Sequence, residues 1–564
     1  MLTRAAQDRP DATAYTQLER GDQPGNVLTY RQLEQQTRKL AGYLQGCVQP
    51  RERVLLAFRN EHQFIVSFFA CLYADVLAVP VPAPTNHKRA SQLFRVIEKA
   101  DPKLILARQD TLSLIQDTVN ARFPGRFPNW PDVGEILTGA PNAWQEQRPA
   151  PESTALLQFT SGSTGNPKGV MVSHSNLIHN CGLLKQALGA TADSRLVSWL
   201  PFFHDWGLIG CIIFPLYMQM PAAFLDPLTF VYRPHWWLQA IDAFRATISC
   251  SPNFGYETCV ERVRPEECEG IDLSTWEVAM IGAEPIQKST IEGFSSRFAS
   301  IGFRENAFYP TYGLAESTLI VSGNKRPSTP VFINARRSAL EKGQLVECDD
   351  SDPIDRRVLV GCGCPIEQQH VRIVDPDTCQ LRDEGTPGEV WISGTSVMDG
   401  YWQDPNSTSE VLVAARIDET ERKYLRTGDI GFILDEQLFI CGRLKDMIIK
   451  GGNNYYAEDI EQTVQRSHSS LRVGRGVAFS VEAAGLERLV VVHEAGYGMV
   501  PEIDELVGAV QKAISGDHQI LADAISLIAP GSLMKTSSGK VRRRLMRSKF
   551  MEKELEIVAS WQNW

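Results

Sequence analysis

The sequence predicts an α/β protein with a large N-terminal domain, built from doubly wound αβαβα subdomains and a small β-rich subdomain, followed by a smaller α+β domain. Two observations lead to this prediction. The first half of the chain alternates helical with strand-like patterns, and shorter strand-like pieces replace them past about residue 330. The length of 564 residues also favours several structural units, since domains average roughly 150 residues.

The first half repeats a helix-and-strand scheme. Residues 29–46 carry apolar side chains at helical spacing, and residues 53–58 form a short apolar run typical of a buried strand. Residues 62–84 predict an apolar helix leading into a strand that prolines end, and residues 89–107 repeat the scheme. Helices between short apolar strands indicate a doubly wound sheet.

Beyond this region the pattern becomes richer in strands. Short strand-like pieces at 371–375, 388–394 and 432–443 are separated by Gly, Pro and Asp, which predicts a β-rich subdomain over residues 330–444. A new α+β pattern then runs over residues 445–564. We therefore place the domain boundary near Lys445, with residues 1–444 as the N-terminal domain.

Charge and cysteine usage narrow the functional classes. The net charge of -10 argues against a general binder of nucleic acid or anionic membranes. The twelve cysteines are scattered without zinc-finger spacing, which predicts free thiols in a reducing cytoplasm.

No membrane segment is predicted. The N-terminus has no apolar core of the signal-peptide kind, and the most apolar run, residues 207–225, is interrupted by Pro215, Gln219 and Pro221. This run predicts a buried helix and strand, and the expected location is cytoplasmic.

A loop rich in hydroxyls and glycines is the first motif that indicates chemistry. "LQFTSGSTGNPKGV", residues 157–170, offers backbone N–H groups and hydroxyls to phosphate oxygens, and Lys168 adds a positive charge. It is not a Walker loop, because Pro167 stands where a glycine is required and Gly169 follows the lysine. Alone, it also fits a polar surface loop.

A second motif, "YPTYGLAES" at 309–317, combines an aromatic ring, a glycine and a carboxylate. Tyr312 offers a flat face to a purine, Gly313 permits a close backbone approach, and Glu316 is a suitable ligand for phosphate-bound Mg²⁺. In isolation such a stretch is usually only a turn.

Two further motifs lie near the expected domain boundary and the C-terminus. "YLRTGDIG", 424–431, contains Asp429, and "GRLKDMIIKGG", 442–452, contains Arg443; such a pair suits ribose hydroxyls but also fits a surface ion pair. "MKTSSGKVRRR", 534–544, presents Lys540 in a Gly/Ser turn, where a solvated lysine is the default interpretation.

Together and in this order, the four motifs resemble those of the adenylate-forming enzymes, which include acyl-CoA synthetases, luciferases and nonribosomal adenylation domains. The resemblance covers nearly the whole chain. Within this superfamily, "WLPFFHDWGLIG" (199–210), "SPNFGYE" (251–257), "MIGAEPI" (280–286) and "YPTYGLAES" are most similar to the fatty acyl-AMP ligases. The resemblance implies a ligase that uses ATP and Mg²⁺ to convert a medium- or long-chain fatty acid into acyl-AMP, with release of pyrophosphate.

The resemblance also implies a role for each motif residue. The loop would hold the β- and γ-phosphates, through Thr160, Ser161, Gly162, Ser163, Thr164, Gly165 and Lys168. The adenine and ribose sites would comprise Gly282, Ala283, Glu284, Tyr312, Gly313, Asp429 and Arg443, with Tyr312 stacked on the base. Glu316, with Thr164, would bind Mg²⁺. Lys540, carried by a mobile C-terminal domain turning about a hinge at Lys445, would bridge carboxylate and α-phosphate oxygens.

An apolar acyl tunnel is expected around residues 202–220 and 233–257, with polar groups at its mouth. The residues assigned to it are His204, Asp205, Trp206, Asn253, Phe254 and Gly255, and His204 is also a catalytic candidate. Amino-acid-activating relatives place an Asp near position 205, so an amino-acid adenylation domain is a minor alternative.

The acyl acceptor is expected to be the phosphopantetheine thiol of a separate holo acyl carrier protein, or of a polyketide or nonribosomal synthase, for lipid, polyketide or lipopeptide synthesis. Fatty acyl-AMP ligases carry an insertion that restrains the C-terminal domain and disfavours CoA, and residues 331–365 are long enough to contain it. A basic run of Arg542, Arg543, Arg544 and Arg547 could meet an acidic carrier. A fatty acyl-CoA synthetase and an inactive nucleotide- or lipid-binding relative are the alternatives.

Overall fold

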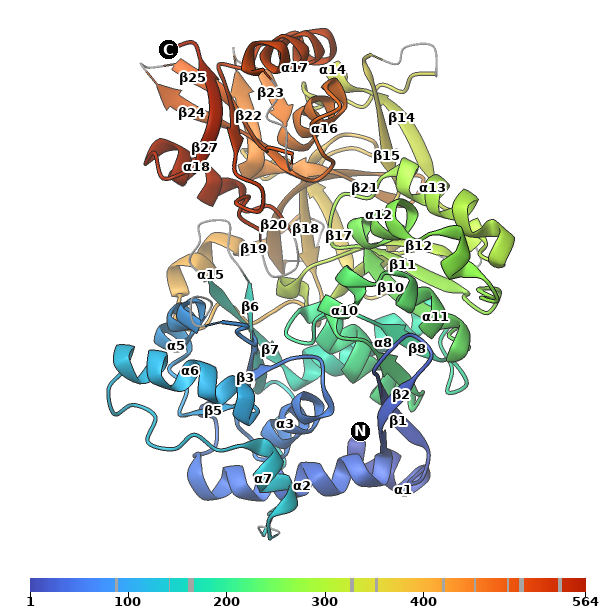
Figure 1. Ribbon diagram of the computed structural model, residues 1–564, viewed down its shortest axis with the longest axis vertical. Helices are drawn as coiled ribbons and strands as arrows, with labels where there is room; N and C mark the ends of the chain where they lie inside the picture. The colour runs from blue at the N-terminus through green and yellow to red at the C-terminus, as the bar shows by residue number, and fades with distance from the viewer. Residues whose placement is uncertain are drawn as a thin grey trace.

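The computed structural model describes residues 1–86, 90–140, 143–160, 167–324, 329–349, 354–417, 421–450, 453–483, 486–496, 502–535 and 540–564. Two sheets and their helices form the lower part of the molecule in Figure 1, and the C-terminal elements lie at the top. None of the described helices is both long and apolar enough to cross a membrane.

The first sheet has five strands in the order β5-β3-β4-β6-β7. Its strands are β3 (Arg53–Phe58), β4 (Leu77–Pro82), β5 (Leu104–Leu106), β6 (Thr154–Thr160) and β7 (Lys168–Ser173), all parallel except β7. Alternate residues of β3 enter different cores: Val54 and Leu56 pack with α2 (Tyr30–Cys47) and α3 (His62–Tyr73), whereas Leu55 packs with α5 (Phe94–Ala100) and α6 (Gln109–Arg122). This sheet is therefore covered by helices on both faces, as doubly wound sheets are.

The second sheet has nine strands in the order β16-β13-β12-β11-β10-β8-β9-β1-β2. Its strands are β1 (Thr13–Leu18), β2 (Pro24–Thr29), β8 (Leu196–Ser198), β9 (Ala222–Phe224), β10 (Ile248–Pro252), β11 (Val278–Gly282), β12 (Phe308–Gly313), β13 (Ile320–Gly323) and β16 (Cys364–Pro365). The neighbouring helices are α1 (Leu2–Asp8), α8 (His174–Leu188), α9 (Phe214–Met218), α10 (Pro227–Tyr232), α11 (His235–Ala243), α12 (Asn253–Arg262) and α13 (Lys288–Phe298). Trp237, Tyr256, Trp276 and Phe294 join α11, α12 and α13 in one aromatic cluster.

The apolar run at 207–225 is a buried helix and strand, as predicted. Residues Trp206–Ile213 form a π-helix, which continues into α9 and then β9. Gly207 is required there, because a Cβ atom would lie 2.0 Å from the carbonyl oxygen of Pro201. All twelve cysteines are free and most are buried, as predicted for the thiols themselves.

The β-rich region follows. It contains β14 (Phe332–Arg336), α14 (Arg337–Leu340), β15 (Arg356–Val360), β17 (His370–Val374), β18 (Gly388–Ser393), α15 (Pro405–Val411), β19 (Leu412–Ala415), β20 (Arg422–Leu434) and β21 (Gln437–Arg443). The stretch 432–443, predicted as one strand-like piece, instead turns back as the β20–β21 hairpin. Asp435 and Glu436 both have positive φ at this turn, as a two-residue hairpin turn of the primed type requires.

The C-terminal elements form a four-stranded sheet with a helical layer on each face, and their first two strands form a separate two-stranded sheet. They are β22 (Met447–Lys450), β23 (Asn453–Tyr456), α16 (Ala457–Ser467), β24 (Gly476–Ala483), β25 (Leu486–Glu494), α17 (Ile503–His518), β26 (Ala524–Ile528), α18 (Arg543–Met551) and β27 (Ile557–Gln562). One face packs on α16 and α17, and the other packs on Met546 of α18.

Candidate functional site

Asp429 and Arg443 stand opposite each other in the β20–β21 hairpin. The Arg443 Nε donates to Asp429 Oδ1 at 2.8 Å, and the Tyr312 hydroxyl donates to Asp429 Oδ2 at 2.7 Å. Burial and the Asp429 charge both raise the pKa of Tyr312, so its hydroxyl keeps its proton and remains a donor. Tyr312, predicted to face the purine, is thus hydrogen-bonded to Asp429, predicted to bind the ribose. Sequence reasoning missed this contact.

The segment after β11 passes very close to β12. A Cβ atom on Gly282 would lie 2.6 Å from the carbonyl oxygen of Thr311, and Ala283 has a φ of 63°. Glu284 Oε1 accepts a 2.6 Å hydrogen bond from the Phe254 backbone N–H at the start of α12. Burial raises the pKa of Glu284 to about 7, although the Lys540 charge and this hydrogen bond act in the opposite direction. Glu284 therefore fixes α12 to the end of β11, while its contact with adenine stays a prediction.

Tyr401 connects the predicted metal ligand to the predicted phosphate loop. Its hydroxyl donates to Glu316 Oε1 at 2.9 Å, and the Lys168 Nζ lies 4.7 Å from the centre of its ring. The backbone N–H of Trp402 also donates to the carbonyl oxygen of Gly169. Sequence reasoning missed Tyr401, because an aromatic residue in the β-rich region gives no signal of its contact with β7.

The phosphate loop is described only at its ends. Thr160 ends β6 and pairs with Lys168, which begins β7, so both stand where the parallel sheet of β3, β4 and β6 has its carboxyl ends. Ser161, Gly162, Ser163, Thr164 and Gly165 lie outside the described residues. Glu316 suits Mg²⁺, since this ion usually takes one or two protein carboxylates together with substrate phosphates.

His204, Asp205 and Trp206 lie at the start of the π-helix. Asp205 Oδ1 lies 2.5 Å from His204 Nδ1 and accepts a 2.7 Å hydrogen bond from the Trp206 N–H. Burial would raise the pKa of Asp205, but the neighbouring His204 and the Lys540 charge together hold it below its ordinary value. Asp205 therefore remains an anion inside the protein.

The electrostatic surroundings of Lys540 join the separate motifs. Desolvation by the surrounding protein and the Arg443 charge lower the pKa of Lys540, although its side chain is exposed, whereas Asp205, Glu284 and Asp429 raise it. A residue from the C-terminal domain thus lies within charge range of the end of β11, the middle of β20 and the start of the π-helix. Residues of all four motifs that the structure describes, Lys168, Tyr312 with Glu316, Asp429 with Arg443, and Lys540, are thus linked to one another.

The three remaining acyl-pocket candidates differ in what they contact. The side chain of Asn253 accepts from the Gln287 N–H and donates to Glu257 and Thr290, so it holds α12 against α13. Phe254 packs edge-on against Trp199 at 5.7 Å, and a Cβ atom on Gly255 would lie 2.7 Å from the same indole. Their place in an acyl pocket stays a prediction.

The prediction that the basic run at 542–547 could meet an acidic carrier is wrong for Arg543. Arg543 does not face a partner, because its guanidinium forms ion pairs inside the C-terminal domain with Asp446, Glu458 and Glu461. Lys445 is exposed and lies in the short turn Leu444–Asp446 between β21 and β22.

Comparison with known proteins agrees with this geometry. The AMP-binding enzyme family matches residues 2–402, and the family described as Disco-interacting protein 2-like, AMP domain, matches residues 445–560. The chain is 39% identical to the medium-chain-fatty-acid–[acyl-carrier-protein] ligase JamA of Moorena producens, over 96% of this chain and 93% of the relative.

Two solved structures are also similar. A fatty acyl-adenylate ligase from a study of the E. coli and L. pneumophila enzymes matches with a TM-score of 0.88 and 30% identity, over 98% of this chain and 96% of that one. The L. pneumophila enzyme solved with acyl adenylate and pyrophosphate matches with a TM-score of 0.75 and 35% identity, over 100% of this chain and 97% of that one. The chain belongs to the fatty acyl-AMP ligases of the AMP-binding enzyme family, and the predicted fold class is confirmed.

Proposed function

We propose that this chain joins a medium- or long-chain fatty acid to AMP, with release of pyrophosphate, and then passes the acyl group to the phosphopantetheine thiol of an acyl carrier protein. The observation that carries the proposal is the position of Lys540, whose charge interacts with Asp205, Glu284, Asp429 and Arg443. Relatives with the same activity in their names, such as JamA, support it.

In the proposed reaction, the fatty acid carboxylate attacks the α-phosphorus of ATP and pyrophosphate leaves. Asp429, held by Tyr312 and Arg443, has free lone pairs that suit the ribose hydroxyls. Lys540 would neutralise charge on the carboxylate and α-phosphate oxygens as they approach, and Lys168 would neutralise charge on the departing phosphates. Mg²⁺ held at Glu316 would supply further neutralisation of the phosphates.

The region 331–365 supports a carrier protein over CoA as the acceptor. Arg357 of β15 forms a buried ion pair with Asp459 of α16 at 3.0 Å, and it donates to the carbonyl oxygen of Cys441. Arg337 of α14 donates to the carbonyl oxygen of Asp517 in α17. These contacts join α16 and α17 to β15 and α14, and they support the proposal that this region restrains the C-terminal domain as an insertion would.

Replacement of Lys540 tests the adenylation step. Lys540→Ala should lower acid-dependent pyrophosphate exchange into ATP by about 100-fold or more, since a preorganised charge at the reacting centre contributes a large part of the rate. The affinity for ATP, measured by calorimetry, should change less than about threefold. Equal losses of exchange and of ATP affinity would contradict the role assigned to Lys540.

The acceptor is tested by offering the wild-type chain a C12 acid and ATP with either CoA or a holo acyl carrier protein. Mass spectrometry should detect the carrier protein with a lauroyl group attached to its phosphopantetheine thiol, and little lauroyl-CoA. Efficient formation of acyl-CoA would favour an acyl-CoA synthetase instead.

A further inference from the structure

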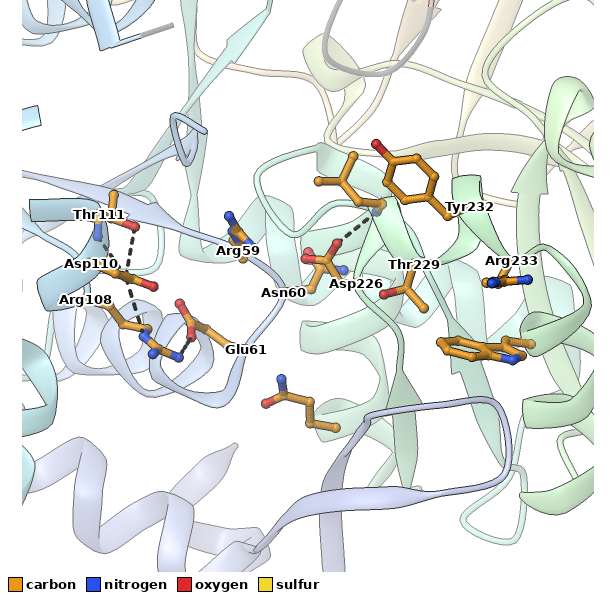
Figure 2. A pocket seen from close by; sticks show the side chains of 13 residues that line it. Arg59, Asn60, Glu61, Arg108, Asp110, Thr111, Asp226, Thr229, Tyr232 and Arg233 are labelled. Carbon is orange, nitrogen blue, oxygen red and sulfur yellow. Dashed lines mark hydrogen bonds and ion pairs between the residues drawn. The ribbon is translucent and has the colours of Figure 1, made fainter. Parts of the chain in front are cut away.

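A cavity of about 510 Å³ opens between the two N-terminal sheets (Figure 2). Arg59 and Arg108 follow the ends of β3 and β5 on one side, and Asp226, Tyr232 and Arg233 come from the end of β9 and from α10 on the other. Ligands of α/β proteins bind at this edge, where the carboxyl ends of parallel strands meet.

The carboxylates of the cavity have ion-pair or hydrogen-bond partners, whereas two of its arginines have no ion pair within the part of the chain that the structure describes. Glu61 forms an ion pair with Arg108 at 3.1 Å, Asp226 accepts from the Leu228 N–H at 2.8 Å, and Asp110 accepts from the Thr111 N–H. Arg59 and Arg233 are both exposed and form no ion pair with any carboxylate among the described residues. The cavity thus has two guanidinium groups available to an anionic partner.

An exposed apolar patch borders these guanidinium groups. Tyr232 is 71% exposed, and Leu228, one helical turn earlier in α10, is 43% exposed. Arg262 adds a third cation, since its guanidinium donates to the carbonyl oxygens of Val231 and Tyr232. An exposed tyrosine surrounded by arginines is typical of protein–protein interfaces, where these residue types contribute most binding energy.

Asn60, in the wall of the cavity, forms hydrogen bonds with the loop at 200–202, which leads to Asp205. Asn60 donates to the carbonyl oxygen of Leu200 at 2.8 Å and accepts from the Phe202 N–H at 3.0 Å. Phe202 precedes Asp205 by three residues, a backbone path of at most about 11 Å. Since the Asp205 charge acts on Lys540, a partner seated on the cavity lies beside the site of chemistry.

We infer that Arg59, Arg233 and the exposed face of α10 form the docking surface for the holo carrier protein that accepts the acyl group. The partner is an acidic protein whose carboxylates meet the guanidinium groups, whose apolar side chains cover Tyr232, and whose phosphopantetheine arm extends toward Asp205. This inference rests on the proposed function. In the transfer itself, the thiol sulfur bonds to the acyl carbonyl carbon, the bond between that carbon and the AMP phosphate oxygen breaks, and the thiol proton passes to solvent as AMP leaves.

The test is charge reversal on this surface, with a bacterial holo acyl carrier protein and lauric acid as probes. The Arg59→Glu/Arg233→Glu variant should lose at least about tenfold in kcat/KM for the carrier, with a weaker dependence on salt concentration. Pyrophosphate exchange and acyl transfer to free pantetheine should be unchanged, because both bypass docking. Tyr232→Ala should show the same selective loss without any change of charge.

Arg148→Glu is the matched control, since the Arg148 side chain is 85% exposed and its ion pair is with the exposed Glu146. It should leave every rate unchanged. Unchanged carrier kinetics in the double variant would overturn the docking surface, and so would an equal loss with carrier and pantetheine. A wild-type chain that forms acyl-AMP but acylates no carrier would overturn the proposed acceptor, and the docking surface with it.

Discussion

Single side chains in this site hold two functional segments at once. Asp429 joins Tyr312 to Arg443, and Tyr401 lies between Glu316 and Lys168. The contacts of Tyr312 with Asp429 and of Tyr401 with Glu316 and Lys168 join segments that are far apart in the sequence, so they fix the distance between parts of the site that would bind different parts of ATP. Glu284 has a similar position between β11 and α12, but it is also a buried carboxyl group with a raised pKa.

This raised pKa predicts a pH dependence of stability. An unfolded chain releases the Glu284 proton near its ordinary pKa of 4.5, whereas the folded chain keeps it until about pH 7. Between these values the folded state binds more protons, so the stability that the neutral carboxyl group contributes is complete below pH 4.5 and is lost as the pH rises to 7. Glu284→Gln stays neutral and avoids this loss.

The unfolding temperature of Glu284→Gln relative to the wild type should therefore rise between pH 5 and pH 8. Glu292→Gln, on the exposed face of α13, is the control and should show the same difference from the wild type at both pH values. A constant difference for Glu284→Gln would mean that this carboxyl group is ionised throughout the range.

At the scale of elements, the contact between β15 and α16 decides how firmly the C-terminal domain is held. Arg357 has its guanidinium 3.0 Å from Asp459 and 4.5 Å from the centre of the Tyr456 ring. Burial raises the pKa of Asp459, whereas the Arg357 charge lowers it, so the carboxylate depends on its partner to remain charged. Removing one member of a buried pair costs roughly 3–5 kcal/mol.

Arg357→Ala should accordingly lower the unfolding temperature and loosen the C-terminal domain. Increased hydrogen exchange in α16 would report the loosening, and a higher ratio of acyl-CoA to acyl carrier product would report its consequence for acceptor choice. Arg337→Ala, which loses hydrogen bonds to the carbonyl oxygens of Ile354 and Asp517 but no ion pair with Asp459, should have a smaller effect on both. If hydrogen exchange in α16 becomes faster but the ratio of acyl-CoA to acylated carrier protein does not change, the restraint on the C-terminal domain is not what excludes CoA.

The elements also show what sequence patterns can predict. Apolar spacing correctly predicted the doubly wound sheets and the buried run 207–225, because burial on two faces leaves a strong pattern. It did not predict the turn at Asp435 and Glu436, since neither residue is a glycine or asparagine. The contacts of Tyr401 and of Arg357 were equally invisible, because they depend on packing between distant segments.

At the scale of the whole molecule, the arrangement of the two domains suits adenylation rather than acyl transfer. Lys540 and Asp205 interact here, which suits adenylation, whereas transfer requires space for a phosphopantetheine arm beside the same groups. The family resemblance implied that Lys540 would join the site, but only the assembled fold shows that the domain containing Lys540 is held through α14 and β15. A rotation of that domain between the two steps would have to occur in the turn Leu444–Asp446.

Lys445→Pro should therefore separate the two half-reactions. Proline fixes φ near −65°, which a helical turn tolerates, but it prevents the backbone rotation that would move the domain. Pyrophosphate exchange should stay within about twofold of the wild type, while acyl transfer to the carrier should fall at least about tenfold. Lys445→Ala keeps the rotation free and should leave both rates unchanged; a proline variant that transfers normally would place the hinge elsewhere.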